Sequence, residues 1–255
     1  MNGDKSGDET YIRYYASKGY VAAAVNYDLN ADGNYIPITE ISEQVKSSVP
    51  AIVEAAAERG YAIDRMALTG GSAGAHLAMV YAYRDAADSR VPVAFVVDMV
   101  GPTCFEPDAW YGFGEIVNVH SQVEPAGEVV DRPTVDYSDP DQAQAGAEWV
   151  SRLTGAEVTP RMMADGSYRA LLAPISPYEL VGQGGVPTIV AYAQADTVLP
   201  SSMEAYLLLA LDEGGVPYDR VTFPKSGHGM QNDPESWTRL FELVDEYLDR
   251  YMPIS

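Results

Sequence analysis

RMALTGGSAGAHLAMV, residues 65–80, decides the fold. Residues 65–69 are a short apolar run of strand length, and a helix is expected to begin straight after the small residues, over 73–86. Ser72 lies between them, in Gly70-Gly71-Ser72-Ala73-Gly74. A serine on such a turn exposes its hydroxyl, and its small neighbours let the backbone bend and a substrate approach. Ser72 is therefore the candidate nucleophile; the alternative is a tight turn that merely needs small residues.

A serine hydroxyl needs a base that takes its proton, and the chain has three histidines. His228 lies in a Ser-Gly-His-Gly loop between the last expected strand and the last expected helix, at the same sheet edge as Ser72. His76 follows Ser72 on the same helix and points along it, which favours a structural role. His120 lies within residues 103–180 and has no candidate partner, which favours a surface role. His228 is the candidate base.

A carboxylate should orient the imidazole, and Asp196 follows the apolar strand 187–193 directly. The resulting chain order of serine, aspartate and histidine is the one expected where the nucleophile lies on a turn between a strand and a helix of a parallel sheet. Asp98, at the end of strand 92–100, is the reserve candidate. Asp196 could instead cap helix 202–213, but Ser201 already occupies the N-cap position, with Glu204 at the capping-box position.

Strands and helices alternate along the chain, which predicts an α/β fold, a mostly parallel sheet covered by helices, within a single domain over residues 1–255. The expected strands are 20–26, 65–69, 92–100, 187–193 and 218–223. The expected helices are 39–59, kinked or split at Pro50, then 73–86, 202–213 and 234–251, the last capped by Asp233.

The alternation breaks over residues 103–180, which are rich in proline, glycine and acidic residues. Long irregular stretches in compact domains are usually functional, so this one is interpreted as a lid or cap insertion. The alternative is an irregular insertion packed on its own aromatic residues. Gly71, Trp110 and Trp149 are the candidates for lining a substrate pocket.

The segments KGYVAAAVNYDL (18–29), AIDRMALTGGSAGAHLA (62–78) and GVPYDRVTFPKSGHGM (215–230) resemble the α/β-hydrolase superfamily, nearest to its hormone-sensitive-lipase-like and bacterial feruloyl/acetyl esterase branch. The resemblance implies an esterase without a cofactor. It implies that Ser72 is the nucleophile, Asp196 the acid and His228 the base, and that the Ala73 N–H is one oxyanion donor.

The chain departs from that branch at its N-terminus. The first three strands of the family sheet, and the His-Gly-Gly turn that supplies the other oxyanion donors, have no counterpart in the sequence. Loss of the third strand would expose two buried edges, so we expect one of three arrangements. Either this chain is the remainder of a longer protein, or strand 20–26 has moved over, or another chain, in a homo-oligomer for example, fills the gap. Because losing one oxyanion donor costs about 10²–10³ in rate, weak activity is expected.

The composition of the chain limits its possible binding partners and locations. A net charge of −21 disfavours nucleic acid and membrane surfaces. The single cysteine excludes an intramolecular disulfide and allows a cytoplasmic location, which is the expectation. Asp28, Asn30 and Asp32 have the spacing of a calcium loop, but an acidic surface turn is the favoured interpretation.

The expected function is therefore carboxylic ester hydrolysis of small acyl or aromatic esters through an acyl-serine intermediate. The main alternative is a non-catalytic or very weakly active binding module on a hydrolase scaffold, supported by the missing oxyanion turn. A peptidase is a third possibility on the same scaffold.

Overall fold

Four parallel strands form the sheet of the computed structural model, which describes residues 4–29, 35–110 and 135–254. They are β1 (Met66–Gly71), β2 (Val93–Met99), β3 (Thr188–Ala193) and β4 (Tyr218–Phe223), paired in the order β1-β2-β3-β4. All three pairings are parallel, as expected from continuous apolar runs. Every residue of β3 is buried, whereas no residue of β1 is.

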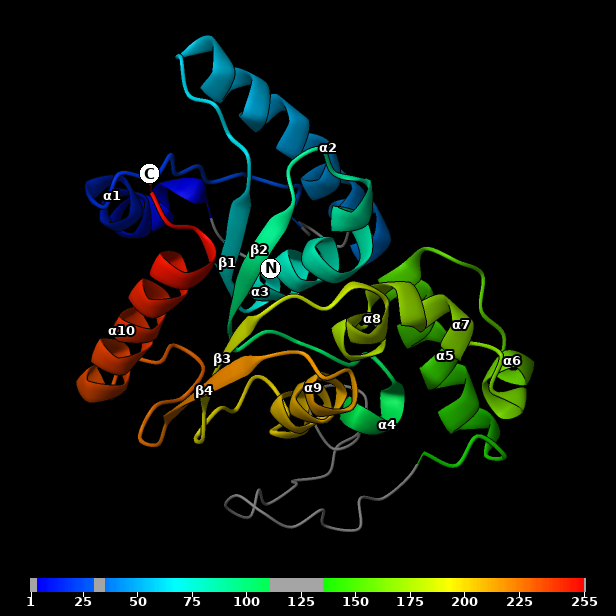
Figure 1. Ribbon diagram of the computed structural model, residues 1–255. Coiled ribbons are helices and arrows are strands. Elements are labelled where there is room, and N and C mark those ends of the chain that lie inside the picture. Colours follow the sequence, from blue (N-terminus) through cyan, green and yellow to red (C-terminus); the bar gives the residue numbers. More distant parts are fainter. Residues whose placement is uncertain (1–3, 30–34, 111–134, 255) are drawn as a thin grey trace.

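Helices cover the sheet on both sides (Figure 1). α1 (Glu9–Ser17) and α10 (Pro234–Tyr251) lie together on one side, and α3 (Ala73–Val80), α8 (Pro177–Gly184) and α9 (Ser202–Glu213) lie on the other. α2 (Ile38–Glu58) contains Pro50 without being split by it. Short helical turns complete these regions at Lys5–Asp8, Tyr81–Asp85 and Ala86–Asp88.

The expected strand over residues 20–26 is absent. The segment is extended, but its only backbone hydrogen bond to another part of the described chain runs from Tyr20 N to Tyr15 O, at 3.2 Å. An apolar run becomes a strand only where a neighbouring backbone supplies hydrogen-bond partners, and none of the four strands pairs with this segment. The prediction of a strand here was therefore wrong, although the chain is extended.

Two predicted helix caps were also wrong. Ser201 has helical backbone angles (φ −59°, ψ −19°) and makes no cap hydrogen bond, so α9 begins without a side-chain cap. Asp233 makes no cap hydrogen bond either, because its carboxylate is used by a neighbouring loop described below. The helix bounds themselves agree with the prediction, since apolar spacing and the flanking proline and glycines determine them.

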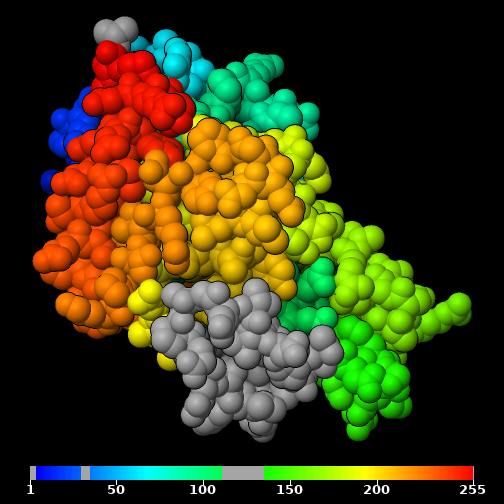
Figure 2. All heavy atoms as spheres, turned by 60° about the horizontal axis from the view of Figure 1, so that its bottom comes forward, coloured from blue at the N-terminus to red at the C-terminus, as the bar shows by residue number. Residues whose placement is uncertain are grey.

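Residues 103–180 are more regular than expected. Their described part folds into α4 (Pro107–Trp110), α5 (Pro140–Thr154), α6 (Pro160–Asp165), α7 (Arg169–Leu172) and a short turn at Ala173–Ile175, before α8. These helices project from the body of the molecule (Figure 2, green to yellow-green). A second hydrophobic core lies among them and includes Ile38 of α2. Its other members are Phe105, Ala143, Ala147, Val150, Met163, Tyr168, Leu172 and Ile175.

No helix in the described part of the chain is long and apolar enough to cross a membrane.

Candidate active site

Ser72 lies on the sharp turn that links β1 to α3. Its φ of 53° and ψ of −119° are unusual for a residue with a side chain. Two backbone hydrogen bonds hold the turn: Ser72 N donates to Met99 O at 2.8 Å, and His76 N donates to Ser72 O at 3.0 Å. Gly70 is required because a Cβ there would lie 2.3 Å from the backbone of Gly74. The hydroxyl is thereby presented at the carboxyl end of the sheet.

The structure brings Ser72, His228 and Asp196 together. The Ser72 hydroxyl lies 2.8 Å from His228 Nε2, and Asp196 Oδ2 lies 2.7 Å from His228 Nδ1. Because a carboxylate only accepts hydrogen bonds, neutral His228 carries its proton on Nδ1, which leaves Nε2 free to accept the serine proton. The side chain of Asp196 is 7% exposed and that of His228 is 23% exposed, so the pair is shielded but reachable.

Asp196 is fixed from its other side by the loop that follows β3. Its Oδ1 atom accepts hydrogen bonds from Val198 N at 2.7 Å and Leu199 N at 3.0 Å. Such an aspartate turn leaves Oδ2 for the imidazole alone. The loops of Asp196 and His228 are also tied together, since Ala195 N donates to Ser226 O at 3.1 Å.

Asp233 anchors the His228 loop, a role that the sequence analysis missed. Its carboxylate accepts hydrogen bonds from Ser226 Oγ at 2.6 Å and from Lys225 N at 3.0 Å. Ser226 Oγ in turn accepts one from Asn232 N at 2.9 Å. Ser226 and Asp233 are both buried, so these bonds are protected from water. Pro234 is typical of a helix start, which is why Asp233 was predicted to be a helix cap. The sequence signal for an anchor was Ser226, a polar residue directly before the Gly-His-Gly loop.

The other candidate histidines and acid lie elsewhere. His76 is buried, donates from Nδ1 to Pro102 O at 2.9 Å, and packs edge-on against Phe105. Burial lowers the pKa of His76 to about 4, so it is neutral near pH 7. His120 lies outside the described residues. Asp98 is fully buried in β2 and accepts from Gly101 N at 2.9 Å; burial raises its pKa to about 8.

A cavity of about 900 Å³ begins at the Ser72 turn. Gly71 lines it together with Ser72 and His228, but Trp110 and Trp149 do not. Both tryptophans lie in the helical insertion, with ring centroids 5.7 Å apart and with indole N–H groups bonded to the carbonyls of Cys104 and Phe105. Their expected part in a substrate pocket therefore stays a prediction.

Ala73 is the first residue of α3, where backbone N–H groups lack partners within the helix. That N–H, next to the Ser72 hydroxyl and at the positive end of the helix dipole, could stabilise a developing oxyanion.

The described residues contain no cluster of side chains that could hold a metal ion. Asn30 and Asp32 of the calcium-loop pattern lie outside them, and Asp28 is hydrogen bonded to Gln44.

The chain was compared with models of known protein families and with known proteins. The model of the family described as BD-FAE matches residues 1–211. The chain belongs to the BD-FAE family. No curated protein matches this BD-FAE member.

Solved structures show that this BD-FAE chain has the α/β-hydrolase fold. The thermophilic esterase Est2 of the planctomycete Thermogutta terrifontis is similar, with a TM-score of 0.68 and 19% identity, over 100% of this chain and 79% of the other. Esterase B of Lactobacillus rhamnosis is similar over 97% of this chain and 71% of the other, with a TM-score of 0.63 and 20% identity. Family and fold together support carboxylic ester hydrolysis.

Proposed function

We propose that this BD-FAE member is a serine carboxylic ester hydrolase. The observation that carries the proposal is the continuous hydrogen-bonded chain from Ser72 Oγ through the His228 imidazole to Asp196. In the proposed reaction, Ser72 Oγ attacks the ester carbonyl carbon while His228 Nε2 takes its proton. His228 then gives that proton to the departing alcohol oxygen, which leaves an acyl ester on Ser72.

Water completes the cycle. His228 takes a proton from a water molecule, whose oxygen attacks the acyl carbon, and the proton then returns to Ser72 Oγ as the acid leaves. Throughout, Asp196 holds the imidazole in one orientation and stabilises its charged form. The Ala73 N–H is the proposed donor to the oxyanion that develops in both steps.

We propose small acyl or aromatic esters as substrates. Est2 of Thermogutta terrifontis binds butyrate and propionate in its solved structures, and its esterase 2 is phosphonylated by sarin. Esterase B of Lactobacillus rhamnosis is inhibited by a tributyrin phosphonate. These are short acyl groups, or phosphorus compounds of the kind that phosphonylate an activated serine, and an activated serine is what is proposed for Ser72.

The test is hydrolysis of p-nitrophenyl butyrate by the wild type, Ser72→Ala and the control Ser47→Ala, whose exposed hydroxyl bonds only to Gln44 O of its own helix. We expect Ser72→Ala to lose at least about 10³-fold in kcat and Ser47→Ala to match the wild type. A fluorophosphonate probe should label only the two proteins that keep Ser72.

The absolute turnover number of the wild type tests a separate point, the number of oxyanion donors. With Ala73 as the single proposed donor, we expect turnover about 10²–10³ below that of an esterase with a complete oxyanion hole. Equal hydrolysis by Ser72→Ala and the wild type would contradict the assignment of the nucleophile. No hydrolysis and no probe labelling by any of the three proteins would favour the non-catalytic binding module.

A further inference from the structure

A short segment at the end of β2 holds the turn that carries Ser72. Met99 O accepts the hydrogen bond from Ser72 N at 2.8 Å, and Pro102 O accepts the one from His76 Nδ1 at 2.9 Å. The first bond reaches the serine itself, and the second reaches α3, the helix that begins directly after it. Residues 99–102, hereafter the support segment, therefore fix both parts of the turn.

The support segment is strained and closely packed. Val100 has a φ of 49°, which is unusual for a residue with a side chain, and its N–H is bonded to a carbonyl of β3 at 2.9 Å. Gly101 lies against α3, since a Cβ there would be 2.9 Å from Met79 Cε and 3.0 Å from Ala75 Cβ. Strained backbone keeps its conformation only where its surroundings hold it, so the bonds of Gly101 help to decide where the segment lies.

The two backbone groups of Gly101 are bonded to a pair of buried side chains. Gly101 N donates to Asp98 Oδ1 at 2.9 Å, and Gly101 O accepts a hydrogen bond from Tyr192 Oη of β3. The Tyr192 hydroxyl also lies next to the Asp98 carboxyl. Asp98 is 0% exposed and Tyr192 is 5% exposed. This arrangement, hereafter the Asp98–Tyr192 clamp, holds Gly101 from both sides.

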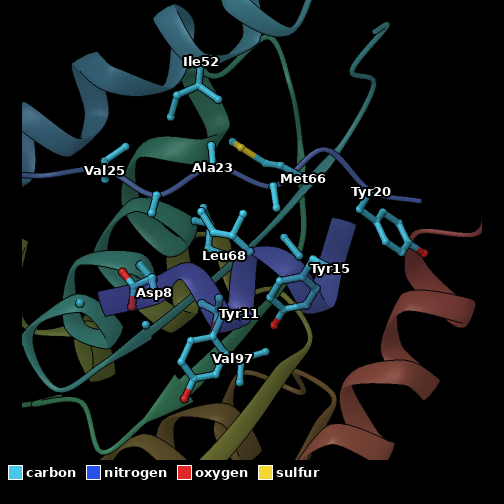
Figure 3. A pocket seen from close by; sticks show the side chains of 18 of the residues that line it. Asp8, Tyr11, Tyr15, Tyr20, Ala23, Val25, Ile52, Met66, Leu68 and Val97 are labelled. Carbon is cyan, nitrogen blue, oxygen red and sulfur yellow. The ribbon is translucent and has the colours of Figure 1, made fainter. Parts of the chain in front are cut away.

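Asp98 acts from the face of the sheet that is turned away from the cavity. Its neighbours in β2, Val97 and Met99, line the cavity that begins at Ser72, and Figure 3 shows Val97 among the surrounding side chains. Successive side chains of a strand point to opposite faces, so Asp98 points the other way and does not line the cavity. It can therefore influence Ser72 only through the residues between them.

The hydrogen bonds of the clamp favour a proton on Asp98. The one proton of the Tyr192 hydroxyl goes to Gly101 O, so the Tyr192 oxygen offers only lone pairs to Asp98. Asp98 Oδ2 is buried and has no hydrogen-bond partner within the described residues. A carboxylate also offers only lone pairs, and a buried charge without a partner is costly. A carboxylic acid instead has a proton to donate to the Tyr192 oxygen.

The other titratable groups that face Asp98 do not provide this proton. Tyr83, in the helical turn after α3, donates to Thr188 Oγ1 at 2.7 Å, because the Thr188 proton goes to Val186 O. Glu204 of α9 brings a second negative charge toward Asp98. Burial, with a smaller part from the Glu204 carboxylate, raises the pKa of Asp98 to about 8.

We propose that Asp98 is a positioning residue: as a neutral carboxylic acid it holds Ser72 in place through the Asp98–Tyr192 clamp. This assignment deepens, and rests on, the proposed role of Ser72 as nucleophile. When Asp98 gives its proton to the solvent, the Tyr192 hydroxyl turns to the carboxylate and releases Gly101 O. The support segment then loosens, and Met99 O no longer fixes Ser72 N. The site is therefore active while Asp98 is protonated and loses activity as pH rises through the pKa of Asp98.

The first test is the pH profile of p-nitrophenyl butyrate hydrolysis by the wild type and Asp98→Asn, with Ser72→Ala as the blank. The asparagine amide keeps an acceptor for Gly101 N and supplies an N–H donor for the Tyr192 oxygen at every pH. From about pH 7.5 to about pH 9.5, we expect kcat of the wild type to fall at least about tenfold with little change in KM. The kcat of Asp98→Asn should stay level over the same range.

Two further variants are the controls. Asp88→Asn makes the same substitution at an exposed position outside the clamp, and its pH profile should match that of the wild type. Asp98→Ala removes both hydrogen bonds of the carboxyl, so kcat should fall about 10–100-fold even at about pH 7, where Asp98→Asn restores it. If Asp98→Ala does not fold, the profiles of the wild type and Asp98→Asn still decide.

Two measurements on the same proteins do not require hydrolysis. Hydrogen–deuterium exchange of residues 70–76 should be equal in the wild type and Asp98→Asn at about pH 6.5, and about tenfold faster in the wild type at about pH 9.5. Infrared spectra of the wild type should show the carbonyl stretch of a carboxylic acid at about pH 6.5. That band should disappear by about pH 9.5 and be absent from Asp98→Asn.

Four results would overturn the proposal. They are an alkaline fall of equal size in the wild type and Asp98→Asn, equal exchange of residues 70–76 at about pH 9.5, no carboxylic-acid band that Asp98→Asn removes, and an Asp98→Asn enzyme as slow as Asp98→Ala. The expected exchange and infrared results without hydrolysis by any protein would support the clamp and contradict the proposed esterase function alone.

Discussion

The strained backbone of Ser72 shows how single residues determine this site. A residue with a side chain at φ 53° costs about 1–3 kcal/mol relative to relaxed backbone. The turn keeps this conformation because Ser72 N and Ser72 O are both hydrogen bonded, and because Gly70 leaves room for the start of α3. The sequence predicted the turn from its small residues. It could not predict the partner Met99 O, since that contact depends on the pairing of β1 with β2.

His76 should make stability depend on pH in the acid range. Its pKa is lowered by burial from 6.5 to about 4 in the folded chain, so the folded state resists protonation that the unfolded state accepts. The stability linked to neutral His76 is fully present above pH 6.5 and is lost as pH falls to about 4. We expect a loss of about 3 kcal/mol over this window, absent in His76→Asn, measured by urea unfolding at several pH values.

Asp98 provides the opposite dependence. Burial raises its pKa from 3.8 to about 8, so the stability linked to its protonated form is present below pH 4 and is lost as pH rises to about 8. Between pH 4 and 6.5 the two groups oppose each other in the wild type. The difference between wild type and His76→Asn is therefore the quantity to follow, and a difference that stays constant from pH 4 to pH 6.5 would contradict the assignment.

Among the elements, those defined by local pattern were predictable. α9 and α10 occupy residues 202–213 and 234–251, as predicted, because their apolar spacing and flanking residues are local signals. The segment 20–26 has an equally apolar pattern but forms no strand, because strand formation needs a neighbour that sequence pattern does not reveal. Its extended shape was predicted, and so was the loss of the third strand beside it. The expected move of the segment into the place of that strand does not occur, since the sheet consists of β1 to β4 alone in the described chain.

The site follows the same division. The contact between Ser72, His228 and Asp196 was predictable from their places after strands, since the carboxyl ends of parallel strands share one edge. Asp233 was missed, because a single aspartate before Pro234 looks the same whether it caps α10 or turns back to Ser226.

The loop between β4 and α10 should therefore depend on Asp233. Asp233→Ala leaves the buried Ser226 O–H without an acceptor, at a cost of about 1–3 kcal/mol, and also removes the partner of Lys225 N–H. We expect His228 to lose its fixed position, kcat for p-nitrophenyl butyrate to fall about 10–100-fold, and KM to change little, because a small displacement of a catalytic group costs about that much.

Glu235→Gln is the control at the same helix end, since Glu235 is exposed in the first turn of α10. Equal kcat values for Asp233→Ala and Glu235→Gln would show that the anchor does not position His228.

At the scale of the whole molecule, excess negative charge opposes compactness. The net charge is −21, so the excess acidic side chains of the folded chain repel one another, and salt screens this repulsion. Raising NaCl from about 0.05 M to about 0.5 M, where the screening length falls several-fold, should raise Tm at pH 7.5 by about 2–4 °C, the shift that corresponds to about 1 kcal/mol. Calorimetry at both salt concentrations measures it.

The isoelectric point supplies the control. Near pH 4.3 the net charge is zero, so the same change of salt should leave Tm unchanged there. A shift of equal size at both pH values would assign the effect to the salt ions themselves rather than to self-repulsion.

The contact between α1 and α10 also determines the order in which the molecule can be assembled on the ribosome. Strand order in the sheet follows chain order, so β1 to β4 can join one after another as they emerge. α1 is synthesised before any of the four strands, but its Tyr14 hydroxyl bonds to Asp245, 231 residues later. α1 must therefore remain undocked from α10 until α10 has been synthesised, and over that time its apolar face is open to chaperones that hold nascent apolar segments.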